Sequence, residues 1–350
     1  MKIIATLTAL FSFTLIALSN EHDMDKIFAG FTGTNSPGAA VMVIQNGKVI
    51  AAKAYGMADI ANKIPITIDS NFRLASVSKQ FTAMSIMILA ERGKLSLDDS
   101  ITKFFPDFPA CGKPMTVRHL LTHQSGILDY EDLIPASVTE QVLDKDVLTI
   151  LEKQDKTMFP VGTKFHYSNT AYALLSLIVE KVSGQTFPDF LHANIFKPLG
   201  MNHSIAYLKG VNVIPNRVFG YAKTATGFEP RDQSVTSAVL GDGGIYSSVT
   251  DMYKWDQALY TEKLVSKKML HEAFTAWSKT SDMDDSGYGY GWYIGKEGGE
   301  NHVWHYGSTC GFNNRFNRFP SKKFSVIILT NRDEAGVKEL GLAVEALYRK

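Results

Sequence analysis

The pattern of apolar and polar residues predicts two strands near the N-terminal end of the chain and a long helix after them. Residues 39–44 and 49–55 are rich in Val, Ile and Ala and flank Asn46-Gly47, the strongest short signal for a hairpin turn. Residues 76–92 contain an almost wholly apolar run without Gly or Pro, built from good helix formers. We therefore expect a β-hairpin followed by a buried helix that ends at Gly93.

The middle and the end of the chain differ in periodicity. From about residue 136 to 275 the pattern predicts mostly helix, at 171–182, 189–196, 251–259 and 266–276, with Gly-, Asn- and Ser-rich loops. The C-terminal part predicts strands at 288–294, 303–306, 312–319 and 324–330, and an amphipathic helix at 334–348. The short connections between these strands favour an antiparallel meander.

Together these elements predict an α+β fold. One antiparallel sheet is built from both termini and flanked by helices, and a mostly helical part is inserted between its two halves. We expect the α/β part at about residues 24–75 and 285–350 and the helical part at about 76–284. The functional site is then expected in the cleft between the two parts.

Composition describes an ordinary globular protein. The chain has 350 residues, of which 45% are hydrophobic and 20% are charged, and its net charge is +1. It is long enough to bury a large core. The sequence has no basic block and no stretch that interleaves Lys or Arg with exposed aromatics, which argues against a nucleic-acid partner.

The N-terminus predicts export. Lys2 precedes an apolar run over residues 3–18, and the small residues at its end fit signal-peptidase cleavage after Ser19. We expect a signal peptide of residues 1–19 and a periplasmic or secreted mature protein of residues 20–350. A retained membrane anchor is the alternative, for which the run is short, and no other segment predicts a stable membrane span.

Cysteine usage is low for an exported protein. Cys111 and Cys310 are the two cysteines of the chain. This count predicts a fold that does not depend on disulfides. Whether the two residues pair depends on their proximity in space, which the sequence leaves open.

Ser76 and Lys79 are the first candidates for chemistry. Residues i and i+3 share a helix face, so the hydroxyl and the amine can meet. Free backbone N–H groups at a helix start suit a developing oxyanion, and a desolvated lysine can act as a base. The alternative is an N-cap serine with a lysine that reaches solvent. A second copy, Ser100 and Lys103, lacks the apolar helix and is interpreted as structural.

Two further short patterns follow in the chain, while the G-x-S-x-G elbow of α/β-hydrolases is absent. Tyr167-Ser168-Asn169 precedes the helix predicted at 171–182, and His305-Tyr306-Gly307 ends a predicted strand. With these motifs in this order, the chain resembles the serine β-lactamase and penicillin-binding-protein superfamily. It is most similar to the branch of class C β-lactamases, D-alanyl-D-alanine carboxypeptidases, D-aminopeptidases and related esterases. The resemblance covers most of residues 24–348 and includes the stretches LLTHQSGI (120–127), GGIYS (243–247) and LTN (329–331).

The resemblance implies a β-lactamase-like fold and a role for each residue of the first two motifs. Ser76 is the expected nucleophile, and Lys79 helps to deprotonate it. Tyr167, as a phenolate or as a hydrogen-bonded shuttle, is the expected base and then protonates the leaving group. A phenolate requires nearby cations that favour the charged form. Asn169 is expected to hold Lys79 and the substrate amide.

The third motif departs from the pattern of many family members, which have Lys-Thr-Gly at this place. The resemblance implies an oxyanion hole from the backbone N–H groups of Ser76 and Ser308, and a strand edge that Gly307 opens to substrate. His305 is expected to contact substrate. A neutral imidazole holds a carboxylate less strongly than a lysine does, which argues against a dedicated β-lactamase.

We therefore expect an exported serine hydrolase that forms an acyl-enzyme at Ser76 and acts on small esters, amides or D-amino-acid peptides without a metal or cofactor. The alternative is a non-catalytic or weakly catalytic protein that binds peptidoglycan peptides or β-lactams. His119 and His123 have the spacing of a metal pair, but no nearby Cys or carboxylate completes a site. The stretch 241–244 (GDGG) matches neither a P-loop nor an EF-hand and is interpreted as a tight turn near the cleft. The sequence leaves the oligomeric state and the natural substrate open.

Overall fold

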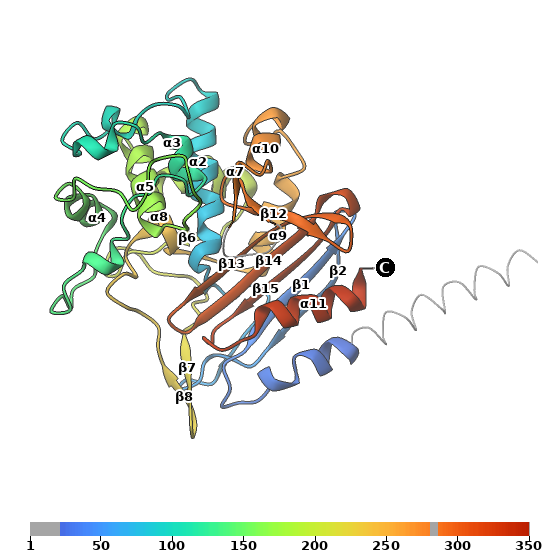
Figure 1. Ribbon diagram of the computed structural model, residues 1–350. Helices are drawn as coiled ribbons and strands as arrows, with labels where there is room; N and C mark the ends of the chain where they lie inside the picture. The colour runs from blue at the N-terminus through green and yellow to red at the C-terminus, as the bar shows by residue number, and fades with distance from the viewer. Residues whose placement is uncertain (1–21, 281–285, 350) are drawn as a thin grey trace, which may run out of the picture.

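The computed structural model describes residues 22–280 and 286–349, and one antiparallel sheet brings together strands from the N-terminal and C-terminal parts of this range (Figure 1). Its order is β10-β11-β12-β13-β14-β15-β1-β2. β1 (Ala39–Gln45) and β2 (Lys48–Tyr55) form the predicted hairpin, and β1 also pairs with β15 (Phe324–Thr330). The predicted sheet built from both termini is therefore confirmed. The predicted signal peptide lies outside the described residues.

The C-terminal strands form the predicted meander. Their bounds are β10 (Ser278–Lys279), β11 (Gly287–Tyr288), β12 (Tyr293–Glu297), β13 (Glu300–Thr309) and β14 (Phe312–Phe319). The single strand predicted over 288–294 is wrong, because the chain turns between β11 and β12. Gly291 in this turn has a φ of +79°, and a Cβ there would lie 2.9 Å from the Lys79 carbonyl oxygen. The strand breaks because the turn packs against the start of a helix.

Short strands form three smaller sheets beside the main one. They are β3 (Met57–Asp59) with β4 (Ile64–Pro65), β7 (Tyr221–Thr224) with β8 (Gly227–Pro230), and β5 (Phe72–Arg73), β9 (Ile245–Ser247) and β6 (Ile205–Ala206). The β7–β8 hairpin projects from the body of the molecule (Figure 1). β5 matters most for the site, because the chain runs from it directly into the turn that carries Ser76.

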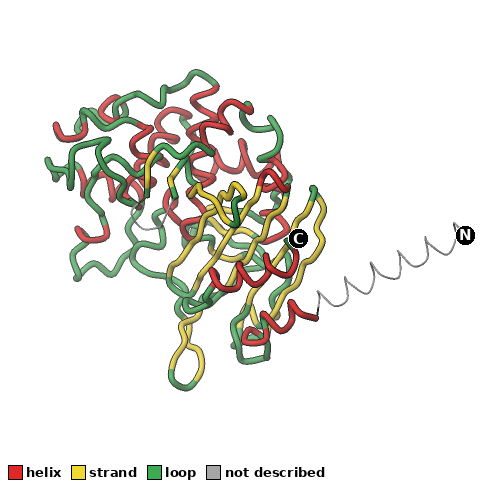
Figure 2. Tube along the Cα trace, turned by 45° about the vertical axis from the view of Figure 1, so that its right-hand side comes forward, coloured by secondary structure: helices red, strands yellow, loops and turns green. Residues whose placement is uncertain are grey.

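The helices gather mainly on one face of the sheet, in the predicted middle of the chain. They are α2 (Lys79–Glu91), α3 (Val117–Leu121), α4 (Asp144–Leu151), α5 (Asn169–Ser183), α6 (Phe187–Leu191), α7 (Lys197–Leu199), α8 (Leu240–Gly243), α9 (Val249–Ala258) and α10 (Lys267–Ala273). α11 (Val337–Tyr348) lies on the other face of the sheet (Figure 2). Short 3-10 turns are η1 (Ala29–Phe31), η2 (Ala75–Ser78), η3 (Ile101–Lys103), η4 (Ala110–Gly112), η5 (Glu131–Leu133) and η7 (Pro320–Lys322), and η6 (His192–Phe196) is a π-helical turn between α6 and α7.

The sheet is buried on both faces, and the side chains of β1 show how. Successive strand residues point to opposite faces. Ala40, Met42 and Ile44 join the large core under the helices, while Val41 and Val43 join a second core with α11 and the helical residues 22–27. A strand covered on both faces must be apolar throughout, which explains the continuous apolar run seen in the sequence.

A buried ion pair links the sheet to the helical part. The Arg318 guanidinium on β14 contacts the Asp256 carboxylate on α9 at 2.7 Å, and both side chains are 1% exposed. Ser325 on β15 donates a further hydrogen bond to the same carboxylate at 2.7 Å. The charge of each partner is therefore satisfied without water.

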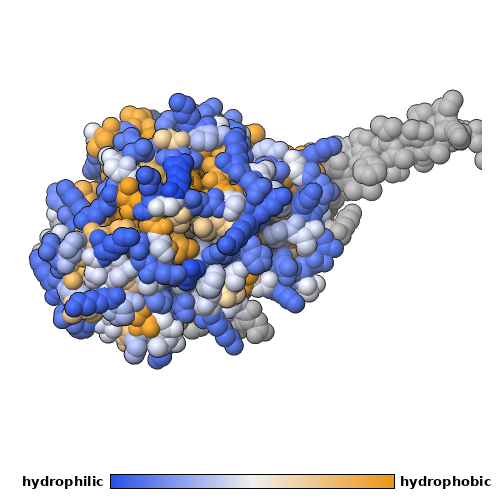
Figure 3. Space-filling view, turned by 90° about the horizontal axis from the view of Figure 1, so that it is seen from above, coloured by the Kyte–Doolittle hydropathy of each residue, from blue (hydrophilic) through white to orange (hydrophobic). Residues whose placement is uncertain are grey.

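The surface of the molecule is largely polar on the face seen from above (Figure 3). Apolar residues gather toward the middle of the face in Figure 3. Within residues 22–280 and 286–349, no helix has both the length and the apolar character needed to cross a lipid bilayer.

The sequence left open whether the two cysteines pair. Cys111 and Cys310 are both free thiols, so they do not form a disulfide with each other.

Candidate active site

The nucleophile candidate lies on a tight turn between β5 and α2. The predicted helix exists, but its first residues form the 3-10 turn η2, and the α-helix begins only at Lys79. Ala75, just before Ser76, has a φ of +50°. This left-handed conformation is uncommon for a residue with a side chain, and strained residues of this kind cluster at functional sites. The turn therefore sets Ser76 at the junction of sheet and helix.

Lys79 is buried and fully hydrogen-bonded. Its amine donates to Ser76 Oγ at 3.2 Å, to Asn169 Oδ1 at 2.8 Å and to the Asp242 carbonyl oxygen at 2.8 Å. An ammonium group has three donors, so all three are used. Burial lowers the pKa of Lys79 to about 8, while the charges of Asp242 and Glu131 oppose this shift. The alternative of a lysine that reaches solvent is excluded, because the side chain is 0% exposed.

Tyr167 lies on the other side of this amine. The Lys79 nitrogen is 4.9 Å from the centre of the Tyr167 ring. The phenol oxygen is buried and makes no hydrogen bond of normal geometry within the described residues. Burial raises the pKa of Tyr167 well above its ordinary value, and the nearby Ser76 hydroxyl opposes that rise. This environment favours the neutral phenol over the phenolate.

Asn169 connects the amine to Glu131, a residue that none of the sequence motifs includes. Its Oδ1 accepts from Lys79, and its Nδ2 donates to Glu131 Oε1 at 3.2 Å. Ser168, not Asn169, caps α5 with its side chain, by accepting from the Ala171 N–H at 3.2 Å. Asn169 is thus free to serve the site from the first residue of the helix.

The third motif approaches Ser76 from the sheet. A Cβ built on Gly307 would lie 2.3 Å from the Leu74 carbonyl oxygen and 3.0 Å from the Ser76 nitrogen. β12 pairs with β13 only from Glu300 to Trp304, so the end of β13 that carries Gly307 and Ser308 has β14 on one side and η2 near the other. The glycine allows this strand edge to reach the nucleophile.

His305 belongs to the packing beneath the site. The ring is buried, with Nδ1 2.6 Å from the Tyr306 carbonyl oxygen and Nε2 2.9 Å from the Tyr288 hydroxyl. Burial and the charge of Lys79 lower the pKa of His305 to about 3. The imidazole is therefore neutral, donates from Nδ1 and accepts at Nε2. In this structure both nitrogens are engaged, so neither is open to a substrate carboxylate.

A small polar cavity opens beside the nucleophile. Its volume is about 60 Å³, and its lining includes Ser76, Asn169, Glu131, Asp242 and Ser308. A larger cavity of about 510 Å³ lies elsewhere, between α4, α5 and residues 208–212, and contains none of the motif residues. The chemistry therefore points to the small cavity.

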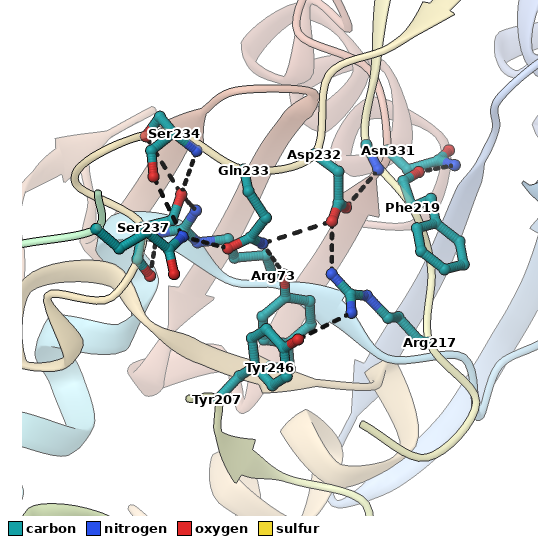
Figure 4. A network of polar contacts seen from close by, with 12 residues as sticks. Arg73, Tyr207, Arg217, Phe219, Asp232, Gln233, Ser234, Ser237, Tyr246 and Asn331 are labelled. Atoms are coloured by element: carbon teal, nitrogen blue, oxygen red, sulfur yellow. Dashed lines mark hydrogen bonds and ion pairs between the residues drawn. The ribbon is translucent and has the colours of Figure 1, made fainter. Parts of the chain in front are cut away.

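The strand that leads into the nucleophile turn is anchored by a polar network (Figure 4). Arg73 on β5 donates to the carbonyl oxygens of Ser237 and Gly243 at 3.1 and 3.3 Å. In the same loop as Ser237, Gln233 donates to the Tyr246 hydroxyl at 3.0 Å. These contacts hold the loop before α8 against β5 and so fix the walls of the cavity.

The remaining sequence candidates have structural surroundings. His119 lies 3.0 Å from the Thr116 hydroxyl through Nδ1, and His123 accepts the Ser168 N–H through Nδ1 at 3.0 Å. No group of three or more His, Cys, Asp or Glu side chains suited to a metal occurs among the residues the structure describes. Ser100 caps η3, and Lys103 pairs with Asp99 at 2.7 Å, as the structural interpretation of that copy predicts.

Comparison with known proteins agrees with this arrangement. A family model described as Beta-lactamase matches residues 24–348. Penicillin-binding protein 4* of Bacillus subtilis (strain 168) is 31% identical over 311 residues, which cover 84% of this chain and 68% of that protein. The D-aminopeptidase of Gluconobacter oxydans (strain 621H) is 28% identical over 321 residues, 90% of this chain and 59% of that protein. A penicillin-binding protein structure from Bacillus halodurans superimposes with a TM-score of 0.81 at 28% identity, covering 94% of this chain and 99% of that one. The chain therefore belongs to the beta-lactamase family of serine hydrolases.

Proposed function

We propose that this protein is a serine hydrolase that forms an acyl-enzyme at Ser76 and acts on small esters or amides, D-amino-acid peptides among them. The observation that carries the proposal is the buried Lys79 amine, 3.2 Å from Ser76 Oγ. Its lowered pKa of about 8 makes a neutral amine accessible near physiological pH. The size of the cavity and the relation to a D-aminopeptidase support a small substrate of this class.

The net result of the proposed acylation step is the transfer of one proton from Ser76 to the leaving group, through Lys79 and Tyr167. Neutral Lys79 takes the proton of Ser76 as Oγ attacks the substrate carbonyl, and the backbone N–H groups of Ser76 and Ser308 stabilise the oxyanion. The Tyr167 phenol gives its proton to the leaving alcohol or amine and is reprotonated by Lys79. Burial raises the pKa of Tyr167, so the phenol carries its proton before the step, and the Lys79 ammonium beside it supplies the replacement. Water then releases the acyl group from Ser76.

The position of His305 refines the expected substrate. A buried, neutral imidazole with both nitrogens engaged offers no cation for a substrate carboxylate. This supports esterase or aminopeptidase-type activity over a dedicated β-lactamase. In this proposal His305 acts by positioning the end of β13, through the Tyr288 hydroxyl.

The test is hydrolysis of a short-chain p-nitrophenyl ester by the protein and by its Ser76→Ala variant. Activity that is lost with the serine supports the acyl-enzyme, and D- and L-amino-acid p-nitroanilides and a chromogenic cephalosporin then define the substrate. Lys79→Ala is expected to slow labelling of Ser76 by an active-serine phosphonate by at least about 100-fold without a matching loss of stability. Equal activity with and without the Ser76 hydroxyl would contradict the proposal. A protein that neither turns over esters nor is labelled at Ser76 would instead be the binding protein considered above.

A further inference from the structure

The short helix α8 is held against the site by three other helices. Thr82 on α2 donates to the Gly241 carbonyl oxygen at 2.7 Å. The Asp144 carboxylate on α4 accepts the backbone N–H groups of Leu240 and Gly241 at 2.8 and 3.0 Å. A Cβ at Gly241 would lie 2.2 Å from the Tyr172 carbonyl oxygen on α5, so glycine is needed for this approach. The position of α8 is therefore fixed from several sides.

Asp242 on this helix turns both its backbone and its side chain toward the site. Its carbonyl oxygen accepts from the Lys79 amine at 2.8 Å, and its Oδ2 accepts from the Tyr130 hydroxyl at 3.0 Å. The Asp242 side chain is 6% exposed and Tyr130 is fully buried. A carboxylate in such surroundings is destabilised unless a cation and hydrogen-bond donors face it. Tyr130 supplies the donor, and Lys79 is the cation.

Asp242 is also the charge that influences Lys79 most. Burial lowers the pKa of Lys79, and Asp242 is the largest of the charges that oppose this shift. Burial raises the pKa of Asp242 to about 7, and Lys79 is the largest opposing charge there. Other titratable groups that interact with one member of this pair or the other are Asp129, Glu131, Asp144, Tyr167, Tyr172, His123 and His305.

We propose that Asp242 is a positioning residue for Lys79, a role that rests on the function proposed above. Its carbonyl oxygen orients the amine toward Ser76. Its carboxylate, held in place by Tyr130, stabilises the ammonium that Lys79 becomes when it accepts the Ser76 proton. Tyr130 acts on Lys79 through Asp242 and is a second positioning residue of the same kind.

The test is the pH dependence of kcat/KM on an uncharged p-nitrophenyl ester. Its acid limb reports the Lys79 amine of the free enzyme. Asp242→Asn keeps the shape of the side chain and removes its charge, so the limb is expected to move to lower pH by about one unit, because the largest of the anionic charges that favour the ammonium is then gone. Tyr130→Phe removes the donor to the carboxylate, which then keeps its proton to higher pH. Its limb is expected to move in the same direction by a smaller amount.

Asp251→Asn is the matched control. Asp251 is a buried carboxylate on α9 that accepts the backbone N–H groups of His203 and Ser204, so its loss is expected to lower stability and leave the acid limb in place. An acid limb that stays at the wild-type pH in Asp242→Asn would overturn the proposal. Should that variant not fold, as judged by near-UV circular dichroism, the same result in Tyr130→Phe would overturn it. Ester hydrolysis that survives Ser76→Ala would instead contradict the acyl-enzyme function itself.

Discussion

Replacing Gly307 with alanine tests how closely the sheet must approach the nucleophile. The added Cβ would lie 2.3 Å from the Leu74 carbonyl oxygen, 3.0 Å from the Ser76 nitrogen and 3.1 Å from the Ala75 Cβ. Ordinary contact begins at 3.4 Å, so β13 and η2 must separate by about 1 Å. The nearest obstacles are backbone atoms, which have no side-chain rotamer to escape into.

Such a displacement falls on the proposed oxyanion hole, because the Ser76 and Ser308 N–H groups assigned to it belong to these two segments. A misplacement of about 1 Å costs about 100-fold in rate, or about 2.7 kcal/mol of transition-state stabilisation. Overpacking is expected to lower the free energy of unfolding by about 1–3 kcal/mol as well. The assay is the second-order rate of phosphonate labelling at Ser76, measured beside the midpoint of urea unfolding.

Gly30→Ala is the control for this experiment. A Cβ at Gly30 meets no heavy atom within 4 Å, so both the labelling rate and the stability are expected to stay at the wild-type level. Labelling of Gly307→Ala at the wild-type rate would show that the strand edge has room for a methyl group. The absence of a side chain at Gly307 would then not be what opens the site.

Two further predictions concern buried charges away from the site. Asp256→Ala leaves the Arg318 guanidinium buried without its partner, and we expect a loss of about 3–5 kcal/mol in unfolding free energy; a loss below about 1 kcal/mol in urea denaturation would contradict this. Burial and a contact with Glu297 raise the pKa of Glu345 to about 8 from 4.5, so the folded state binds this proton more tightly than the unfolded state. The stability from this group is therefore complete below pH 4.5 and is lost as the pH rises to about 8. The urea midpoint of the wild-type protein is therefore expected to decline between about pH 5 and 9, and Glu345→Gln is expected to reduce this decline. A variant with the same decline as the wild type would rule out Glu345 as its source.

Local sequence signals predicted the elements whose causes are local. The Asn46-Gly47 turn has φ values of +52° and +75°, which are the left-handed angles that a type I′ hairpin turn requires. The contact of Ser76 with Lys79 follows from spacing alone, although the turn between them proved to be a 3-10 turn. Motif order and family resemblance, not residue chemistry, pointed to Tyr167.

The features that the sequence did not predict depend on contacts between distant segments. Asp242 was interpreted only as part of a tight turn, because nothing near it in the chain indicates that it meets Lys79, 163 residues away. His305 was expected at the substrate, and only the fold reveals that the Tyr288 hydroxyl engages its ring. The break in the strand predicted over 288–294 has the same origin, since Gly291 packs on α2.

The pairing of β1 with β15 has a consequence for the newly made chain. Gln45 pairs with Phe324, which follows it by 279 residues in the chain. At about 5–20 residues per second, a ribosome needs roughly 15 to 60 s to cover that distance. During this time one edge of the β1–β2 hairpin has no partner strand, and η2 has no β13 to pack against. A nascent chain cut short before β13 would carry Ser76 and Lys79 but lack one wall of the site, so hydrolytic activity is expected to arise only when synthesis is nearly complete.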